Sequence, residues 1–401
     1  MTGKLMQSAE QHETPLAHLE PEGTFLLRSP GRSLTARGIA AVLPAGTAAT
    51  LGERVRNFFA ENPHGPRLLL GALPFDLQQE DYLVQPLAFS PTALLPVVTL
   101  APAYEQPWTV TAEPDAAGYS NMVARALEFM RSPPGRAQQL DKVVLARRLA
   151  VHTDKALDPA YLASRLARDP AVTAFIMPLP SRGGLVRHLV GGTPELLVAR
   201  QGLTVRSNPL AGSARRSTDP VLDRQAAEAL LASDKDQREH AMVVEEILDN
   251  LAPYCEQLQV TERSVLQSTA SMWHLGSKIE GRLRSAETSS AELAACLHPT
   301  PAVAGFPRHH AQQLIHELEP FERDFYAGAI GWTDEQGDGE WYVSLRCGEI
   351  CGNQVLLYAG AGIVEGSDPQ AEAEETSGKF MALLNALGID EHGRRVAGVE
   401  D

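Results

Sequence analysis

The chain has 401 residues and a formal net charge of −15, from 35 basic and 50 acidic side chains. This charge disfavours nucleic acid and anionic membranes as partners, because both bind basic surfaces. No apolar run approaches the roughly 20 residues that span a bilayer, and no secretory leader is visible. Four cysteines do not make a disulfide framework, so we expect a reduced, cytoplasmic setting.

We expect one compact unit, although the length alone would allow two or three domains. No low-complexity linker divides the chain, and no internal repeat is visible. The parts that we predict are a flexible lead-in over 1–20, an N-terminal structural part over 21–135, a catalytic region over 136–392 and a C-terminal tail over 393–401.

Apolar periodicity switches between strand-like and helix-like segments along the chain. Apolar segments bounded by proline and glycine predict strands over 24–29, 67–75, 94–103 and 142–151, and a run of strands over 175–205. Helical periodicity is found over 48–62, 120–132, 159–168, 221–251, 291–297 and 311–318. Because strands and helices mix without a regular alternation, the pattern favours the α+β class.

The most informative stretch is the last hairpin and helix. In an alternating strand from Trp341 onward, Arg346 shares a polar face with Tyr342, and its guanidinium is suited to binding a carboxylate. Gly352–Asn353 predicts the hairpin turn. The return strand runs into a Gly-Ala-Gly turn over 360–362, where missing side chains let backbone amides approach a ligand.

The last helix is predicted to begin at Asp368–Pro369 and to end at Gly388. The spacing i, i+3, i+7 places Glu372, Glu375 and Lys379 on one face of this helix. Two carboxylates and an ammonium beside an arginine strand suggest a carboxylate site bridged by Mg²⁺. The alternative is a solvated helix face with ordinary ion pairs.

A second acidic pair, Asp236 and Glu239, is spaced i, i+3 on the predicted helix over 221–251. Facing the last helix, it could complete a divalent cation site, since Mg²⁺ commonly takes one or two protein carboxylates plus substrate and water. Lys142, at the start of a strand, and Glu195, in a turn, are unremarkable taken alone. The small-residue segments 208–216 and 297–307 are of a kind that lets backbone approach a ligand.

Taken in order, these segments resemble the chorismate-utilising enzymes, and most closely their isochorismate synthases of the siderophore type. The resemblance is dense from Lys142 to Gly388, and its motifs are KVVLARR, GGTPELLVAR, NPLAGSARR, LLASDKDQREH, TASMWHLGSKIEG, LHPTPAVAGFP, ELEPFERDFYAGAIGW, GEWYVSLRC and YAGAGIVEGSDPQAEAEET. It implies the α+β chorismate-binding fold, with two packed β-sheets flanked by helices.

The resemblance also implies a role for each matching residue. Lys142 would activate water for attack at C2 of chorismate, and Glu195 would protonate the departing C4 hydroxyl. The matching Mg²⁺ ligands are Glu239 and Glu372, with Glu375 and Asp236 close by. Four positions match those that hold the substrate carboxylates: Arg346, Tyr358, Gly362 and Lys379. Three match the loop that lines the side of the departing hydroxyl: Ala211, Gly212 and Ser213.

The implied activity is the Mg²⁺-dependent conversion of chorismate to isochorismate, feeding siderophore biosynthesis, with menaquinone biosynthesis left open as the alternative destination. We expect a monomer. A salicylate synthase, which would go on to eliminate pyruvate, is the nearest alternative. Ala302 favours stopping at isochorismate because salicylate-forming relatives tend to have threonine there, whereas Tyr326 and Leu345 are less decisive. Anthranilate and aminodeoxychorismate synthases fit less well, since anthranilate synthases usually lack the lysine. A chorismate-binding regulatory protein would be expected to have lost Lys142, Glu195 or a metal-binding glutamate, and all of these are present.

Overall fold

The structure is a computed structural model that describes residues 23–29, 32–91, 108–132, 135 and 139–396. Its strands are β1 (Phe25–Ser29), β2 (Arg32–Val42), β3 (Leu68–Leu73), β4 (Tyr82–Ser90), β5 (Thr109–Glu113), β6 (Lys142–His152), β7 (Thr173–Arg182), β8 (Leu185–Thr193), β9 (Leu196–Gln201), β10 (Thr204–Asn208), β11 (Leu210–Arg215), β12 (Cys255–Ser268), β13 (Met272–Leu283), β14 (Gly305–Phe306), β15 (Ala329–Asp334), β16 (Gly339–Val343), β17 (Cys347–Cys351) and β18 (Gln354–Val364). Its helices are the short 3-10 helix η2 (Ala48–Thr50), α2 (Leu51–Glu61), α3 (Ala116–Arg131), α4 (Pro159–Leu166), α5 (Pro220–Ala232), α6 (Asp234–Leu251), α7 (Ser290–Leu297), α8 (Arg308–Leu318) and α9 (Pro369–Leu387).

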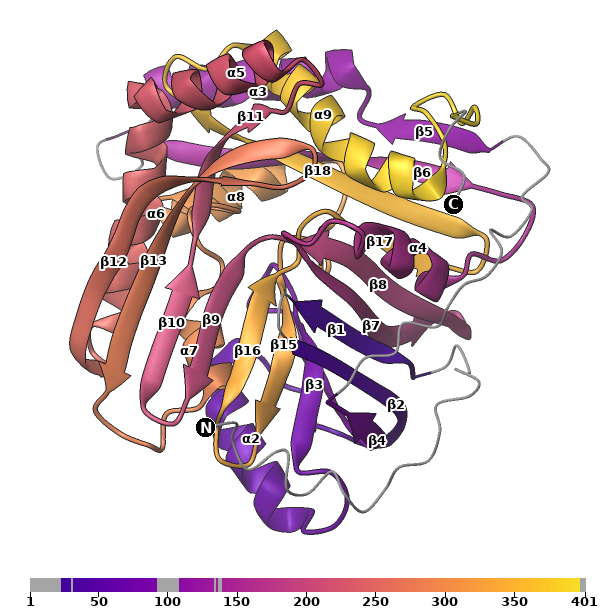
Figure 1. Cartoon of the computed structure of the whole chain (residues 1–401), viewed down its shortest axis with the longest axis vertical. Coiled ribbons are helices and arrows are strands. Elements are labelled where there is room, and N and C mark those ends of the chain that lie inside the picture. Colours follow the sequence, from indigo (N-terminus) through magenta and orange to yellow (C-terminus); the bar gives the residue numbers. More distant parts are fainter. Residues whose placement is uncertain (1–22, 30–31, 92–107, 133–134, 136–138, 397–401) are drawn as a thin grey trace.

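The strands form one antiparallel hydrogen-bonded network. From one edge to the other, the neighbours are β12, β13, β10, β9, β16, β15, β3, β4, β2, β1, β7, β8, β17, β18, β6 and β5. β11 adds to β13 and β14 adds to β6. The α+β class is confirmed, and the two sheets that we predicted are the two halves of this network, joined through β3, β4 and β2 (Figure 1).

Two hydrophobic cores lie on opposite faces of the half that contains β1, β7 and β8. Alternate side chains of a strand point to opposite faces, so Phe25 and Phe175 enter the larger core, which also takes side chains from β3, β15 and β16. Leu26 and Ile176 enter the second core, together with side chains of α4 and α9. Because this half is apolar on both faces, it is held between the other half and the helices.

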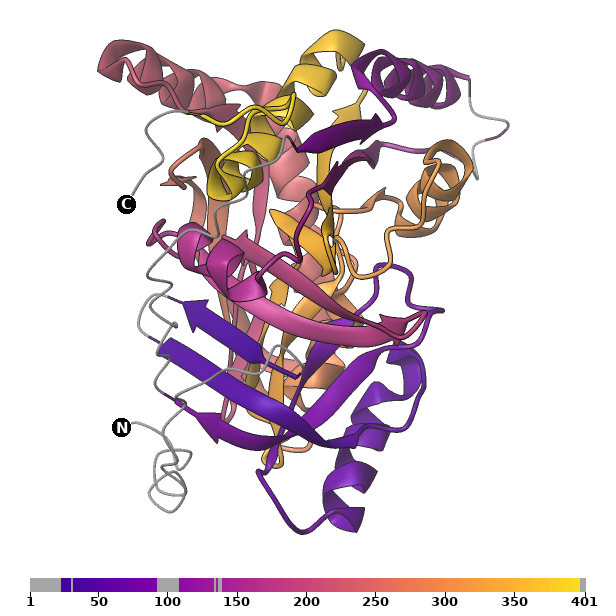
Figure 2. The same ribbon diagram turned by 90° about the vertical axis from the view of Figure 1, so that its right-hand side faces the viewer.

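The helices cover the outside of the network. In Figure 1, α9 runs across β18 and β6, and it packs against α3; in Figure 2, α3 and α5 are at the top of the molecule and α2 at the bottom. α6 packs against β11, β12 and β13. The start of β6 and the first turns of α6 and α9 are thereby brought to one region of the molecule.

The long helix predicted over 221–251 is wrong, because the structure has two helices there. α5 ends at Ala232 and α6 begins at Asp234, with Ser233 between them in an extended conformation. The Ser233 side chain accepts a hydrogen bond from the amide of Asp236 and so caps α6. Residues 233–240 contain no apolar side chain, and Ser233 and Asp236 have the spacing of a helix N-terminal capping motif, so the sequence carried a local signal for this break that the prediction of one long helix overlooked.

The alternation predicted from Trp341 to Arg346 is also interrupted. β16 ends at Val343, and Arg346 has a left-handed backbone with φ of +47° before β17 begins. The predicted glycine turn over 360–362 is instead part of β18, where Gly362 pairs with Val144 of β6. The hairpin turn at Gly352–Asn353 is confirmed, since β17 and β18 pair through Cys351 and Gln354 on either side of it.

Strands from both sides of the predicted boundary at residue 135 pair with each other, as β1 does with β7 and β3 with β15. The boundary itself stays a prediction, and the strand predicted over 94–103 lies outside the described residues. Among the residues that the structure describes, no helix is long and apolar enough to cross a membrane.

Candidate active site

One pocket gathers most of the predicted site residues. Its lining includes Glu195, Ala211, Gly212, Ser213, Glu239, Arg346, Tyr358, Gly362, Glu375 and Lys379. The free volume is about 80 Å³, well below the roughly 300–1,000 Å³ of typical small-molecule sites. The side chains that line the pocket must therefore move apart to admit a substrate.

Lys142 lies behind the wall of this pocket. It is the first residue of β6 and fully buried, and its Nζ is 2.8 Å from Oε1 of Glu239 on α6. Lys142 Nζ has no hydrogen-bond partner among the described residues, so this contact is an ion pair without a hydrogen bond. Gly362 makes the approach possible, because a Cβ there would lie 2.6 Å from Glu239 Oε1 and 3.0 Å from Lys142 Cε.

Glu195 is a buried carboxyl group in the turn between β8 and β9. Burial raises its pKa to about 8, although a backbone hydrogen bond from Leu210 and the positive charges of Lys142 and Arg346 act in the opposite direction. The group is therefore largely protonated at neutral pH. A carboxylic acid in this state can donate a proton to a leaving oxygen, so its environment fits a general acid.

The two acidic helices face each other, as the sequence suggested. Burial and then the negative charge of Glu375 raise the pKa of Glu372. Glu239 and Glu375, from the two helices, likewise add to the effect of burial in raising the pKa of Asp236. Four carboxylates from α6 and α9 are thus close enough to repel one another.

Each of three carboxylates in this group is paired with a lysine. Lys142 pairs with Glu239, Lys235 Nζ lies 3.0 Å from Glu372 Oε1, and Lys379 Nζ lies 2.6 Å from Glu375 Oε1. Lys379 also donates a hydrogen bond to the backbone carbonyl oxygen of Gly360. These ammonium groups balance most of the negative charge, and the Lys379 pair lowers the pKa of Glu375 despite its burial.

The guanidinium of Arg346 differs from those of Arg187 and Arg323, two buried arginines of the molecule. Arg187 and Arg323 each pair with a glutamate, whereas no described side chain forms a hydrogen bond or an ion pair with the guanidinium of Arg346. Burial lowers its pKa, and a guanidinium in such a place is best satisfied by an incoming anion. The left-handed backbone at Arg346, which costs roughly 1–2 kcal/mol for a residue other than glycine, aims this side chain into the pocket.

We expect Arg346→Lys to raise the KM for an anionic substrate by at least about tenfold, because lysine keeps the charge but loses the planar two-pronged donor. Steady-state kinetics would measure this effect. Arg282→Lys is the matched control, because Arg282 forms an exposed pair with Glu256 outside the pocket. Unchanged KM and kcat in Arg346→Lys would remove Arg346 from the substrate site.

Small residues and stacked rings complete the wall. Gly212 has φ of +77°, and a Cβ there would approach Asp236 to 3.0 Å. Ser213 donates a hydrogen bond to Glu375, which ties β11 to α9. On the other side, the ring of Tyr358 stacks on that of Tyr326 with centroids 4.7 Å apart. The pocket therefore has a polar, acidic side and an aromatic side.

Sequence reasoning missed the roles of two lining residues, Lys235 and His274. His274 is buried, its Nε2 has no partner among the described residues, and burial lowers its pKa to about 3, so the imidazole is neutral. The positive charges of Arg346 and Lys379 act in the same direction. Lys235 lies four residues before Glu239 on α6, a spacing that places both on one helix face and was a usable signal.

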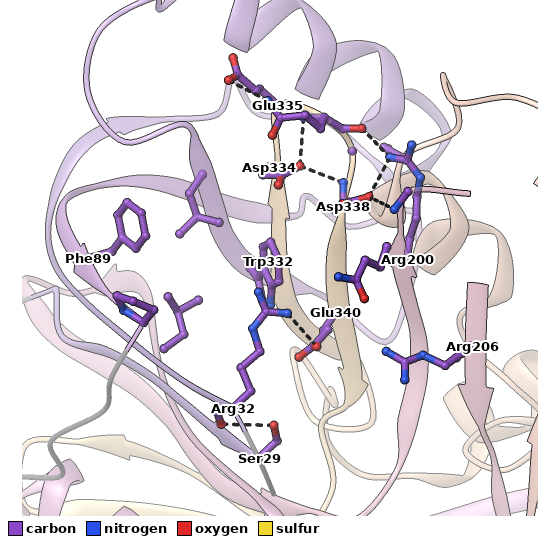
Figure 3. A pocket seen from close by; sticks show the side chains of 18 of the residues that line it. Ser29, Arg32, Phe89, Arg200, Arg206, Trp332, Asp334, Glu335, Asp338 and Glu340 are labelled. Carbon is purple, nitrogen blue, oxygen red and sulfur yellow. Dashed lines mark hydrogen bonds and ion pairs between the residues drawn. The ribbon is translucent and has the colours of Figure 1, made fainter. Parts of the chain in front are cut away.

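A larger cavity of about 1490 Å³ lies elsewhere, beside β1, β2, β15 and β16 (Figure 3). There the guanidinium carbon of Arg32 lies 4.6 Å from the ring centroid of Trp332, and Arg32 Nη1 lies 3.1 Å from Glu340 Oε1. Arg200 donates a hydrogen bond to the carbonyl oxygen of Gln336. No predicted site residue is among the described residues that line it. This cavity is larger than the candidate active site, but its described lining contains none of the residues to which the predicted chemistry is assigned.

The chain matches the family of chorismate binding enzymes over residues 94–388. This match covers more than half of the chain, including β6, the acidic helices and the whole pocket. The protein belongs to the chorismate-binding enzymes.

Its relatives define the group within that family. The chain is 38% identical to isochorismate synthase DhbC of Bacillus subtilis, over 94% of this chain and 98% of that one. It is 37% identical to isochorismate synthase EntC of Escherichia coli K12, over 95% and 98% of the two chains. A Bacillus anthracis structure assigned as a 2,3-dihydroxybenzoate-specific isochorismate synthase superposes with a TM-score of 0.84 at 37% identity, covering 96% of this chain and 99% of that one. Within the family, the chain groups with the isochorismate synthases.

Proposed function

We propose that this protein is an isochorismate synthase, an isomerase that converts chorismate to isochorismate. The observation that carries the proposal is the protonated Glu195 carboxyl group in the same pocket as the unpaired guanidinium of Arg346, with Lys142 close behind. An acid, an amine and an anion-binding group are the parts that a hydroxyl exchange on a dicarboxylate needs.

The reaction adds a water oxygen to C2 of the ring and breaks the bond between C4 and its hydroxyl, while the ring double bonds shift. Lys142, in its neutral amine form, would remove a proton from the attacking water. Glu195 would give its proton to the departing hydroxyl, which leaves as water. Because one water is consumed and one is released, substrate and product are isomers, and no redox cofactor is needed.

Arg346 and Lys379 would hold the substrate carboxylates, with Tyr358 and the backbone at Gly362 beside them. Arg346 is available for this role, whereas Lys379 must share its ammonium group with Glu375 and Gly360. The segment Ala211–Ser213 would lie on the side of the departing hydroxyl. The substrate would then contact both the proton-donating carboxyl group of Glu195 and the positively charged guanidinium of Arg346.

We further propose that a divalent ion, Mg²⁺, binds at Glu239 and Glu372 with Glu375 nearby. Oxygen donors of this kind suit a hard cation, and Mg²⁺ commonly takes only one or two protein carboxylates, so two glutamates on facing helices fit it. Among the described residues, no three such side chains converge on one point, which is compatible with a site completed by water and substrate. When bound, Mg²⁺ would stabilise negative charge on a substrate carboxylate.

We also propose a metabolic route for the product, a cellular location and an oligomeric state. The 2,3-dihydroxybenzoate specificity assigned to the Bacillus anthracis protein supports a route to a catechol product of the kind used in siderophores. The free cysteines Cys255, Cys296, Cys347 and Cys351 fit the cytoplasm. We expect the protein to act as a monomer.

Purified protein incubated with chorismate and Mg²⁺ should produce isochorismate, detected by chromatography, with little pyruvate. Ala302 lines the pocket as a small apolar residue, and this favours stopping at isochorismate over salicylate formation. Treatment with EDTA should abolish product, and adding Mg²⁺ should restore it. Stoichiometric pyruvate and salicylate would establish a salicylate synthase, and full activity after EDTA treatment would remove the metal from the proposal.

A further inference from the structure

Lys235 forms an ion pair with Glu372, one of the two glutamates that we propose as ligands of the metal ion. Its Nζ is 3.0 Å from Glu372 Oε1, and the Glu372 side chain is only 4% exposed, against 37% for Lys235. The negative charges of Glu239 and Asp236 also act on this ammonium group. Lys235 therefore lies among the proposed metal ligands, held by a helix different from that of its partner.

The other contact of Glu372 comes from its own helix terminus. The hydroxyl group of Ser367, just before α9, forms a hydrogen bond with the Glu372 carboxylate. With both an ammonium and a hydroxyl group attached, this carboxylate is satisfied without a metal. A Mg²⁺ ion would need to lie about 2.0–2.1 Å from a carboxylate oxygen, and an ammonium on that oxygen would then repel the ion at short range.

We propose that Lys235 is a tethered cation that competes with the divalent ion for Glu372 and so sets the metal affinity of the site. This inference rests on the proposed function, because it presumes that Glu372 is a metal ligand. When the ion binds, Lys235 leaves the carboxylate. The 37% exposure of Lys235 gives its side chain room to turn toward solvent, and the arriving ion replaces its positive charge beside the buried Glu372 carboxylate, so that carboxylate is not left without a partner.

The test is direct binding of Mn²⁺ to the metal-free, full-length protein, without substrate, followed by the electron paramagnetic resonance signal of the free ion. Lys235→Met should bind Mn²⁺ about tenfold more tightly than the unchanged protein, because the competing charge is gone. Lys235→Arg, which keeps a cation able to pair with Glu372, should restore the weaker affinity. Lys235→Gln provides a second neutral variant, and thermal unfolding of each metal-free protein checks its fold.

Arg238→Met separates direct competition from a general change in charge. Arg238 is exposed on the same helix, next to Glu239, and removing it changes the net charge by the same amount as Lys235→Met. An affinity gain in Lys235→Met and Lys235→Gln but not in Arg238→Met supports the proposal. An equal gain in Arg238→Met, or no gain in either neutral variant, overturns it.

The result also distinguishes this inference from the proposed function. If the unchanged protein binds Mn²⁺ and the two neutral Lys235 variants bind it with the same affinity, only the role of Lys235 is wrong. If neither the unchanged protein nor these variants bind Mn²⁺, either alone or with chorismate added, the metal site at Glu239 and Glu372 is itself wrong, and the competition proposed for Lys235 is wrong as well.

Discussion

Replacing Lys142 by alanine is expected to lower kcat by about 10²–10⁴-fold, the usual cost of removing a general base. Lys142 is fully buried at the start of β6, and its side chain passes beneath Gly362 toward Glu239. Lys235 and Lys379 extend from α6 and α9 toward Glu372 and Glu375, so neither occupies the place of Lys142 at the start of β6. Product formation from chorismate, measured by chromatography, gives the rate.

Loss of Lys142 also leaves Glu239 without its ion-pair partner, which is costly for a carboxylate with little exposure. Thermal unfolding must therefore accompany the kinetics, so that a loss of folded protein is not taken for a loss of chemistry. Lys278→Ala is the control, because Lys278 forms an exposed pair with Glu262. A folded Lys142→Ala protein with near-normal turnover would show that Lys142 is not the base.

Glu195→Gln should cause the second large loss, again about 10²–10⁴-fold in kcat, because an amide keeps the size of the acid but cannot deliver its proton. The change removes no ion pair, since Glu195 is held by burial and by a backbone hydrogen bond. Folding should therefore be preserved. Glu262→Gln, at the exposed pair with Lys278, is the matched control.

The pH dependence provides an independent check on Glu195. The acid form is the active one, and it predominates below the pKa of about 8 and is lost above it. The kcat/KM of the unchanged protein, which reports groups in the free enzyme, should therefore fall by about tenfold per pH unit well above pH 8 as Glu195 loses its proton. In Glu195→Gln the residual kcat/KM should lack this fall. The same alkaline fall in both proteins would assign it to another group.

The sequence by itself determined the local features on which the site is built. Asp368 caps α9 by accepting a hydrogen bond from the amide of Ala371, and Gly388 ends the helix with φ of +76°, as predicted. The spacing of Glu372, Glu375 and Lys379 on one face follows from the helix alone. Capping and periodicity depend on neighbours within a few residues, so they can be read without the fold.

The resemblance supplied the residues that the local patterns left unremarkable. Lys142 and Glu195 have no short-range signature, because a lysine that opens a strand and a glutamate in a turn are common. Only the order of motifs over more than half of the chain indicated them. The break between α5 and α6, by contrast, had a local signal that the prediction of one long helix overlooked, since Ser233 and Asp236 have the spacing of a helix N-terminal capping motif within a polar stretch.

The tertiary structure alone decided the charge states and the pairings. The pKa of Glu195 depends on how much water the surrounding strands exclude, and that exclusion comes from segments distant in sequence. The pairs of Lys142 with Glu239 and of Lys235 with Glu372 each join two elements that only the fold brings together. The unpaired guanidinium of Arg346 likewise follows from a left-handed backbone at the corner between β16 and β17, which alternation along a strand could not anticipate.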